Sequence, residues 1–293
     1  DREGVPAGLL EQARQLRDQM LERLADVDLD LMEKFLNEKE ISEEDIKRAT
    51  RHAVLTLCIT PVFCGTAFKN KGIRLLLDAV VDYLPSPVDR GIIVGSDLDD
   101  REKAISRKPS PKEPFAALAF KIINDAFVGQ QTFIRVYSGE LQAGSYVYNP
   151  VKDKRERIGR ILRIHADRRE EVDAVRAGDI AALIGTKFTT TGDTLCSEKE
   201  PLLLENIHYP DTVIDLKIEP PSARERDRLS AALHKLSLED PSFKVHFDDE
   251  TEETVISGMG ELHLDIIVDR LRTEHKVDVK VGQPAVAFRE AIT

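Results

Sequence analysis

The sequence predicts a multidomain protein of α+β and β structure, with three units arranged in series. Apolar residues first recur at the spacing of helices, and near residue 113 this changes to short, strand-like apolar runs. Near residue 213 the pattern changes again, and strands alternate with helices from there on. A chain of 293 residues is long enough for two or three domains that each have a core.

The first unit is expected to be helical over residues 6–56. Its apolar residues lie at three- and four-residue spacing along one helix face, namely at Leu9, Ala13, Leu16, Met20 and Leu24. Ser42 followed by Asp45 predicts an N-cap for a helix over residues 43–56.

Further along, residues 59–63 predict a short apolar strand and residues 64–72 a loop. A helix over residues 72–83 then ends before two closely spaced prolines. Residues 89–112 are polar and contain two more prolines, so we expect a linker there.

The second unit, over residues 113–203, is expected to be a small β-barrel. Short apolar runs such as FAALAFKII, QTFIRVY and GDIAALIG are separated by turns that contain glycine. The clearest turns are Ser138-Gly139, Ala143-Gly144 and Ala177-Gly178.

The third unit, over residues 204–283, is expected to be a ferredoxin-like plait. In the run VIDLKI, Ile214, Leu216 and Ile218 face one way, as in a strand with one buried face. The same reasoning predicts strands over residues 213–218, 243–247, 253–257 and 277–281. It predicts helices over residues 224–238 and 260–275. The order of these strands and helices is β-α-β-β-α-β.

Composition excludes several classes of protein. The three cysteines, Cys58, Cys64 and Cys196, are odd in number and scattered, which indicates reduced thiols and a cytoplasmic location. No apolar run approaches the roughly 20 residues that span a bilayer, so we expect no membrane association. The sequence begins at Asp1 without a Met, and we expect it to be a piece of a longer protein.

The net charge of −11 argues against a nucleic-acid partner, but the basic residues are unevenly distributed. A cluster comprises Lys152, Lys154, Arg155, Arg157, Arg160, Arg163, Arg168 and Arg169, against only Asp153, Glu156 and Asp167. An acidic protein can still present one basic face to RNA.

The most specific motifs lie between Leu238 and Asp269, where the sequence is LEDPSFKVHFDDETEETVISGMGELHLDIIVD. EDPSF followed at this spacing by SGMGELHL closely resembles the third domain of elongation factor G. That factor is the translational GTPase that moves tRNA and mRNA through the ribosome.

The resemblance extends along the chain. Residues 1–88, through GTAFKNKGIRLLLDAVVDYLPSP, resemble the end of the G domain with its helical insert. Residues 113–203, through RVYSG and TGDTL, resemble the second domain, and residues 284–293 resemble the first strand of the fourth. The resemblance thus implies a helical G-domain remnant, a translation-factor β-barrel and a ferredoxin-like domain.

The implied function is that of a fragment of a ribosomal translocase, which couples GTP hydrolysis to tRNA and mRNA movement during protein synthesis. An alternative within the same architecture is a ribosome-protection or ribosome-recycling paralogue that acts mainly by binding the ribosome. Departures from the family pattern at Gln131, at Gly185-Thr186 and over residues 222–226 leave both open. The tip of the fourth domain would discriminate between them.

The resemblance also implies a nucleotide site. Thr66, Ala67 and Phe68 correspond to the family's last guanine-specificity element, where small residues let backbone N–H groups reach the base; alone, they would indicate only a strand-to-helix loop. The parent protein would bind GTP or GDP with Mg²⁺. This sequence contains no G-x-x-x-x-G-K-[ST], so we expect no catalytic residue here, no bound nucleotide and no GTP hydrolysis by this chain alone.

The partner implied is the ribosome, both its RNA and its small-subunit proteins. Arg155, Arg157 and Arg160 are the candidate phosphate contacts, and the alternative is a solvated hairpin with interleaved acids. His263 lacks a second histidine at metal-binding spacing, so we expect a packing or interface role and no metal site.

Overall fold

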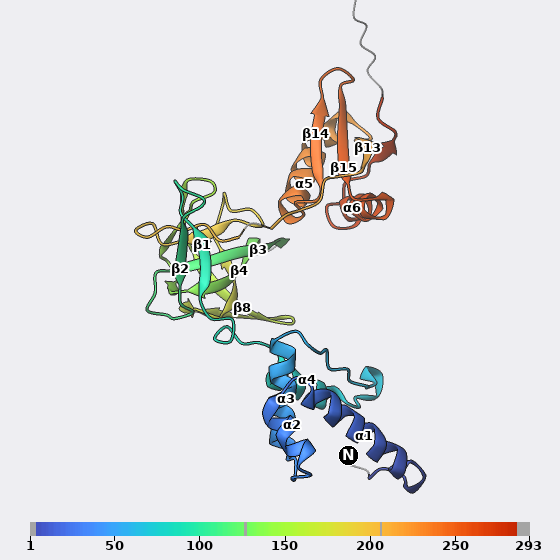
Figure 1. The fold of residues 1–293 in the computed structure, drawn as a ribbon. Coiled ribbons are helices and arrows are strands. Elements are labelled where there is room, and N and C mark those ends of the chain that lie inside the picture. Colours follow the sequence, from blue (N-terminus) through green and yellow to red (C-terminus); the bar gives the residue numbers. More distant parts are fainter. Residues whose placement is uncertain (1–3, 126–127, 206, 286–293) are drawn as a thin grey trace, which may run out of the picture. The chain divides into compact units, whose positions relative to one another are not determined.

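The structure, a computed structural model, describes residues 4–125, 128–205 and 207–285 (Figure 1). The chain divides after Arg90 into two compact units. The first, residues 1–90, corresponds to the predicted helical unit, and the second, residues 91–293, contains both the predicted barrel and the predicted plait.

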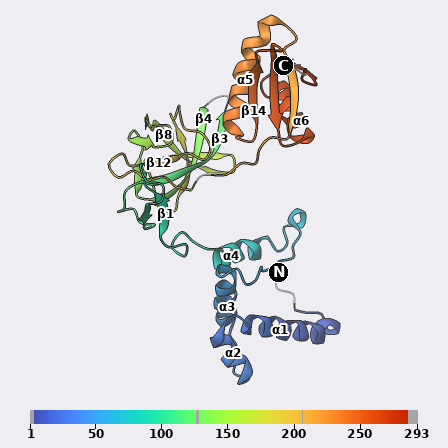
Figure 2. The same ribbon diagram turned by 45° about the horizontal axis from the view of Figure 1, so that its top comes forward.

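The first unit is helical. Its elements are η1 (Ala7–Leu9), α1 (Leu10–Ala25), α2 (Leu29–Leu36), α3 (Glu43–Leu55), η2 (Ala67–Lys69) and α4 (Ile73–Tyr83). In both ribbon views α3 runs between α2 and α4 (Figures 1 and 2). The small core of this unit contains Leu24, Leu31 and Ala49.

Local hydrogen bonds define where these helices begin. Ser42 and Asp45 form a capping box at the start of α3, which confirms the predicted N-cap. Asp28 caps α2 by accepting from the Leu31 N–H at 2.9 Å, and the Arg48 guanidinium donates to the same carboxylate at 2.8 Å. The prediction of helical structure over residues 6–56 is therefore correct, but the stretch is divided into three helices, α1, α2 and α3.

The strand predicted over residues 59–63 is wrong. These residues are irregular, because within residues 4–90 the structure describes no strand that could pair with them. The loop that follows is closed by an isolated bridge between Thr66 and Lys71. Gly72 adopts a φ of +79°, and a Cβ there would lie 2.9 Å from the Cys64 carbonyl oxygen, so this tight loop requires glycine.

Helix α4 leaves most of its apolar side chains exposed. Ala79 is its one buried residue. Leu75, Leu77 and Val81 are 68%, 60% and 79% exposed. An amphipathic helix normally buries its apolar face, so α4 has a face that the described residues of this unit do not cover.

The second unit begins with strands. They are β1 (Ile93–Ser96), β2 (Ala104–Arg107), β3 (Ala116–Asp125), β4 (Gly129–Ser138), β5 (Glu140–Gln142), β6 (Tyr146–Asn149), β7 (Lys154–Arg157), β8 (Arg160–His165), β9 (Arg168–Val172), β10 (Ala174–Arg176), β11 (Ile180–Ile184) and β12 (Thr194–Cys196). Contrary to the prediction of a linker over residues 89–112, β1 and β2 form an antiparallel hairpin. Backbone hydrogen bonds between Ser96 and Leu203 tie it down, which a polar composition does not reveal.

Strands β3 to β12 enclose one core. The large sheet has the order β7-β6-β12-β3-β4-β11-β8-β9, and β5 pairs with β10. Inward residues from most of these strands meet in a single aliphatic cluster that includes Ile134, Val136, Ile161, Leu183 and Leu195. This is the predicted barrel.

Two departures from the family pattern lie inside this barrel. Gln131 is 2% exposed and Thr186 is 4% exposed. The Thr186 hydroxyl is 2.7 Å from that of Thr132, so the polar group brought inside by Thr186 has a hydrogen-bond partner.

The remaining elements form the plait. They are β13 (Ile214–Glu219), η3 (Ala223–Glu225), α5 (Arg226–Glu239), β14 (Lys244–Asp248), β15 (Glu253–Gly258), α6 (Glu261–Thr273) and β16 (Lys280–Gly282). The sheet order is β14-β15-β13-β16, and every pair is antiparallel. Leu233, Leu236, Leu264 and Leu271 of the helices pack with Ile218 and Ile256 of the sheet. The predicted β-α-β-β-α-β order is confirmed.

Candidate nucleic-acid interface

The hairpin of β6 and β7 gathers aromatic and basic side chains on its outward face. Tyr146 lies opposite Arg157, and Tyr148 lies opposite Arg155. Because side chains alternate between the two faces of a strand, these four side chains share the face that is turned away from the barrel core. The structure therefore brings together Arg155 and Arg157, two of the three candidate phosphate contacts.

The inward residue of β7 is a buried carboxylate. Glu156 is 4% exposed. It accepts hydrogen bonds from the N–H groups of Lys187 and Phe188 and from the Thr189 hydroxyl. A buried charge is tolerated only when it is well hydrogen-bonded, and these three donors meet that need. Glu156 thereby fixes the loop at 187–189 against β7.

The two outward arginines differ in their surroundings. The Arg155 guanidinium carbon lies 4.4 Å above the centre of the Tyr146 ring, and its Nε is 3.7 Å from the Glu198 carboxylate. Arg157 is exposed and, among the described residues, has no ion-pair partner within 4 Å. Both groups are therefore accessible to a phosphate or a base.

Arg160 does not belong to this face. It is the first residue of β8 and lies 3.8 Å from the Glu171 carboxylate of β9. Three more arginines of the cluster, Arg163, Arg168 and Arg169, also lie on β8 and β9, which stand at the opposite end of the strand order from β7. Arg169 is held by Asp125 at 2.6 Å. One cluster in the sequence thus becomes two groups in the fold.

Thr66, Ala67 and Phe68 lie together in the tight loop of the first unit. The Thr66 N–H donates to the Lys71 carbonyl at 3.0 Å, so that N–H is already satisfied. Ala67 and Phe68 begin the short helix η2, and the Phe68 side chain is fully exposed.

His263 connects the two most specific motifs. Its Nδ1 accepts from the Met259 N–H at 3.1 Å, which leaves the proton on Nε2 to be donated to Asp240 at 2.9 Å. Asp240 also accepts from the Ser242 N–H at 2.9 Å. Burial acts to raise the pKa of Asp240, but the hydrogen bonds from Ser242 and His263 outweigh it and lower the pKa below its ordinary value.

These contacts give His263 the packing role expected of it. Within the described residues there is no group of three His, Cys, Asp or Glu side chains placed to hold a metal ion.

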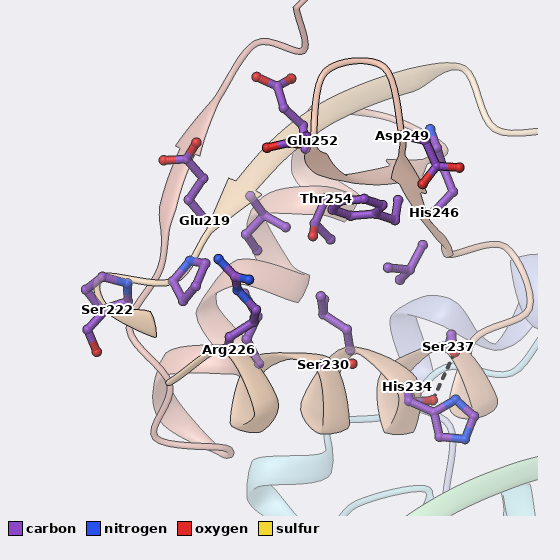
Figure 3. Close-up of a pocket in the computed structure, with 18 residues that line it drawn as sticks. Glu219, Ser222, Arg226, Ser230, His234, Ser237, His246, Asp249, Glu252 and Thr254 are labelled. Atoms are coloured by element: carbon purple, nitrogen blue, oxygen red, sulfur yellow. Dashed lines mark hydrogen bonds between the residues drawn. The ribbon is translucent and has the colours of Figure 1, made fainter. Parts of the chain in front are cut away.

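A groove of about 1080 Å³ runs between α5 and the β14–β15 hairpin. Figure 3 shows Arg226 and Ser230 rising from α5 into it, with Asp249 and Glu252 on the hairpin side. Ser237 donates to the backbone carbonyl of His234 at 2.9 Å and not to its ring. The walls of the groove carry both basic and acidic side chains, and we assign no chemistry to the groove.

Sequence reasoning overlooked Tyr146 and Glu156. The alternation in YVY and in RER was the available signal, since it places both tyrosines and both arginines on one face and Glu156 on the other. Among the described residues, no helix is both long enough and apolar enough to cross a membrane.

Comparison with known proteins bears on both domains of the second unit. Residues 129–196 match the family described as elongation factor Tu domain 2, and residues 209–283 match elongation factor G, domain III. The whole fold is similar to that of a crystal structure from Thermus thermophilus, with a TM-score of 0.78 and 27% sequence identity. That match covers 97% of this chain and 40% of the Thermus chain.

Proposed function

Because this chain is elongation factor G-like, with a Tu-type domain 2 followed by a G-type domain III, we propose that it forms part of a ribosomal translocase. In that role the complete protein couples GTP hydrolysis to the movement of tRNA and mRNA. The order of these two domains along one chain is the observation that carries the proposal.

The proposed partner is the ribosome in the cytoplasm, contacted at small-subunit RNA and proteins. The outward face of the β6–β7 hairpin supports an RNA contact, because Arg155 and Arg157 are exposed on a strand that Glu156 fixes from inside. Arg160 is the third proposed phosphate contact, from the separate strand β8. Phosphate contacts of this kind position a protein on RNA without reading its sequence.

We further propose that the first unit is the end of a G domain. The exposed apolar face of α4 supports this, since the rest of such a domain would cover it. In the complete protein, GTP or GDP with Mg²⁺ is bound mainly by that remainder, and Thr66, Ala67 and Phe68 contact the guanine base. Small residues at 66 and 67 suit a close approach of the backbone to the base.

Charge reversal tests the RNA contact. We expect the 293-residue chain to bind isolated small ribosomal subunits, and Arg155→Glu, Arg157→Glu and Arg160→Glu together to weaken that binding. Each lost phosphate contact should also reduce the slope of log affinity against log salt concentration by about 0.7–0.9. Co-sedimentation over a series of salt concentrations measures both quantities.

The matched control reverses three exposed arginines of α1, namely Arg14, Arg17 and Arg23. It changes the net charge equally but leaves the barrel intact, so its salt slope should stay near that of the parent. Equal losses in both triple variants, or none in the barrel variant, would contradict the proposed contact.

Nucleotide binding provides a separate test. Because the phosphate-binding motifs are not in this sequence, a fluorescent guanine nucleotide should bind the chain negligibly. Micromolar binding would contradict our assignment of most of the nucleotide site to the rest of the G domain.

A further inference from the structure

We infer that the outward face of the β6–β7 hairpin holds an unpaired RNA nucleotide, whose base stacks on the guanidinium plane of Arg155. The inference rests on the proposed function and specifies which part of the RNA this face contacts. A phosphate contact would require only positive charge on this face. Tyr146 and Arg155 provide a flat surface there as well.

The flat surface consists of the Tyr146 ring and the Arg155 guanidinium over it, here called the Tyr146–Arg155 pair. Tyr146 is 54% exposed, although it lies within a strand, and the Arg155 guanidinium carbon lies 4.4 Å from the centre of its ring. A guanidinium held over an aromatic ring is oriented by the cation–π attraction. Arginine planes and aromatic rings are the surfaces on which proteins stack unpaired bases. Tyr146 is thus the positioning residue, and Arg155 is the group that touches the base.

A phosphate group has a place beside this surface. Arg157 lies directly across from Tyr146, so its guanidinium is a neighbour of the Tyr146–Arg155 pair on the same face. It has no ion-pair partner within 4 Å among the described residues. A nucleotide whose base lies on Arg155 can therefore place its phosphate at Arg157.

The other tyrosine of this face is restrained. The Tyr148 hydroxyl donates to the Asp153 carboxylate at 2.9 Å, which raises the pKa of Tyr148. Tyr148 therefore braces the turn between β6 and β7, and Tyr146 is the ring that supports the stacking surface.

The surface is formed before RNA arrives. Glu156 lies between Arg155 and Arg157 on the inward side of β7, and its three hydrogen bonds fix the strand that carries both arginines. A binding surface that is already ordered loses less conformational entropy on binding. The alternative is that Tyr146 and Arg155 form a solvated pair that binds no base. In that case Arg155 would contribute only its positive charge to RNA binding.

Arginine-to-lysine substitution separates stacking from charge. Arg155→Lys keeps the positive charge but removes the plane, whereas Arg157→Lys keeps the charge and the N–H donors with which a lysine binds phosphate. The probe is a short single-stranded oligoribonucleotide with 2-aminopurine at one position, compared with the same oligonucleotide that is abasic there. Fluorescence of 2-aminopurine reports stacking, and anisotropy of an end label reports affinity for the 293-residue chain.

We expect the parent to bind the base-containing oligonucleotide about tenfold more tightly than the abasic one. Arg155→Lys and Tyr146→Ala should abolish this preference, and Arg157→Lys and Tyr146→Phe should retain it. A preference that survives Arg155→Lys, or an equal affinity of the parent for both oligonucleotides, overturns the inference. Tyr146→Phe keeps the ring, so retention there together with loss in Tyr146→Ala assigns the preference to the ring and not to the hydroxyl.

The two proposals fail separately. If the parent binds small subunits through its arginines but shows no preference for the base, the stacking inference is overturned and the proposed function stands. If the base preference behaves as expected but small subunits do not bind, the stacking surface is supported and the ribosomal role is not.

Discussion

The two units of this chain bury their apolar side chains to very different extents. In the second unit, the barrel and the plait each close around a cluster of buried aliphatic residues. In the first unit, the buried cluster is small, and α4 exposes Leu75, Leu77 and Val81. Hydrophobic burial is the main stabilising term in folding, so the second unit contains its own source of stability and the first contains little of it.

This difference bears on function as well. The candidate RNA-binding face lies on the unit with complete cores, where a rigid barrel holds its arginines in place. The candidate guanine loop lies in the unit whose apolar face is uncovered. We therefore expect RNA binding to survive in this chain and nucleotide binding to require more of the protein.

The largest expected effect comes from the core of the second unit. Leu236 in α5 is fully buried, so Leu236→Ala should lower the free energy of unfolding of the plait by about 2–5 kcal/mol. Leu75 in α4 is a matched leucine that is 68% exposed, and Leu75→Ala should change stability by less than about 0.5 kcal/mol. Urea denaturation followed by far-ultraviolet circular dichroism measures both variants. Equal losses would mean that α4 is covered after all.

The second effect sharpens the description of the barrel. Glu156→Gln keeps one oxygen that can accept from the N–H groups of Lys187 and Phe188, but these hydrogen bonds lose their charge assistance and the Thr189 hydroxyl loses its acceptor. We expect a loss of about 1–3 kcal/mol in the free energy of unfolding. Glu198→Gln is the control, since Glu198 is exposed and meets Arg155 only at 3.7 Å, and it should be close to neutral. A neutral Glu156→Gln would show that the loop at 187–189 is held by other contacts.

The contrast between these two glutamates also shows how far the sequence can lead. Alternating and helical periods predicted the three kinds of unit and the order of the plait, because those periods arise from one-sided burial. Glu156 was not predicted, since a carboxylate between two arginines is normally solvent-exposed and only the fold supplies its three buried donors. Residues 59–63 were wrongly predicted as a strand, and the β1–β2 hairpin was missed, for a related reason. A strand depends on a hydrogen-bonded neighbour, which can lie far away in the sequence or be absent from the described residues of the unit.

The candidate site was predicted in part. Arg155, Arg157 and Arg160 were selected as one basic cluster, and the structure places Arg155 and Arg157 on one face of β7. Arg160 was grouped with them because it is close in sequence, but a new strand begins there. The role of Thr66, Ala67 and Phe68 stays a prediction that came from resemblance and not from their chemistry.

A third, smaller effect concerns pH. The pKa of Asp240 is lowered in the folded protein, so its ionised form stabilises the plait above its unfolded pKa of about 3.9, and this contribution is lost as the pH falls through the folded pKa. Asp240→Asn should therefore be less stable than the parent at neutral pH, by about 1 kcal/mol. The difference should shrink below about pH 4. Urea denaturation of both proteins at neutral and acidic pH tests this, and a gap that widens in acid would reverse the assignment.

The smallest effect lies in the first unit. Ser42→Ala removes the side-chain acceptor of the α3 capping box and should lower stability by about 0.5–1 kcal/mol. Ser42→Thr keeps the hydroxyl, which accepts from the Asp45 N–H and donates to the Asp45 carboxylate, and should restore most of the loss. Circular dichroism during thermal denaturation distinguishes the two, and identical behaviour of both variants would show that α3 does not depend on this cap.

Amide hydrogen exchange of the intact chain tests the difference between the units most directly. We predict that the central strands β4 of the barrel and β15 of the plait exchange only through openings that cost nearly the full free energy of unfolding. We predict that α4 exchanges through much easier, local openings, because Ala79 is its one buried residue. Protection of α4 as strong as that of β4 and β15 would contradict the account, since it would show that the first unit is as complete as the second.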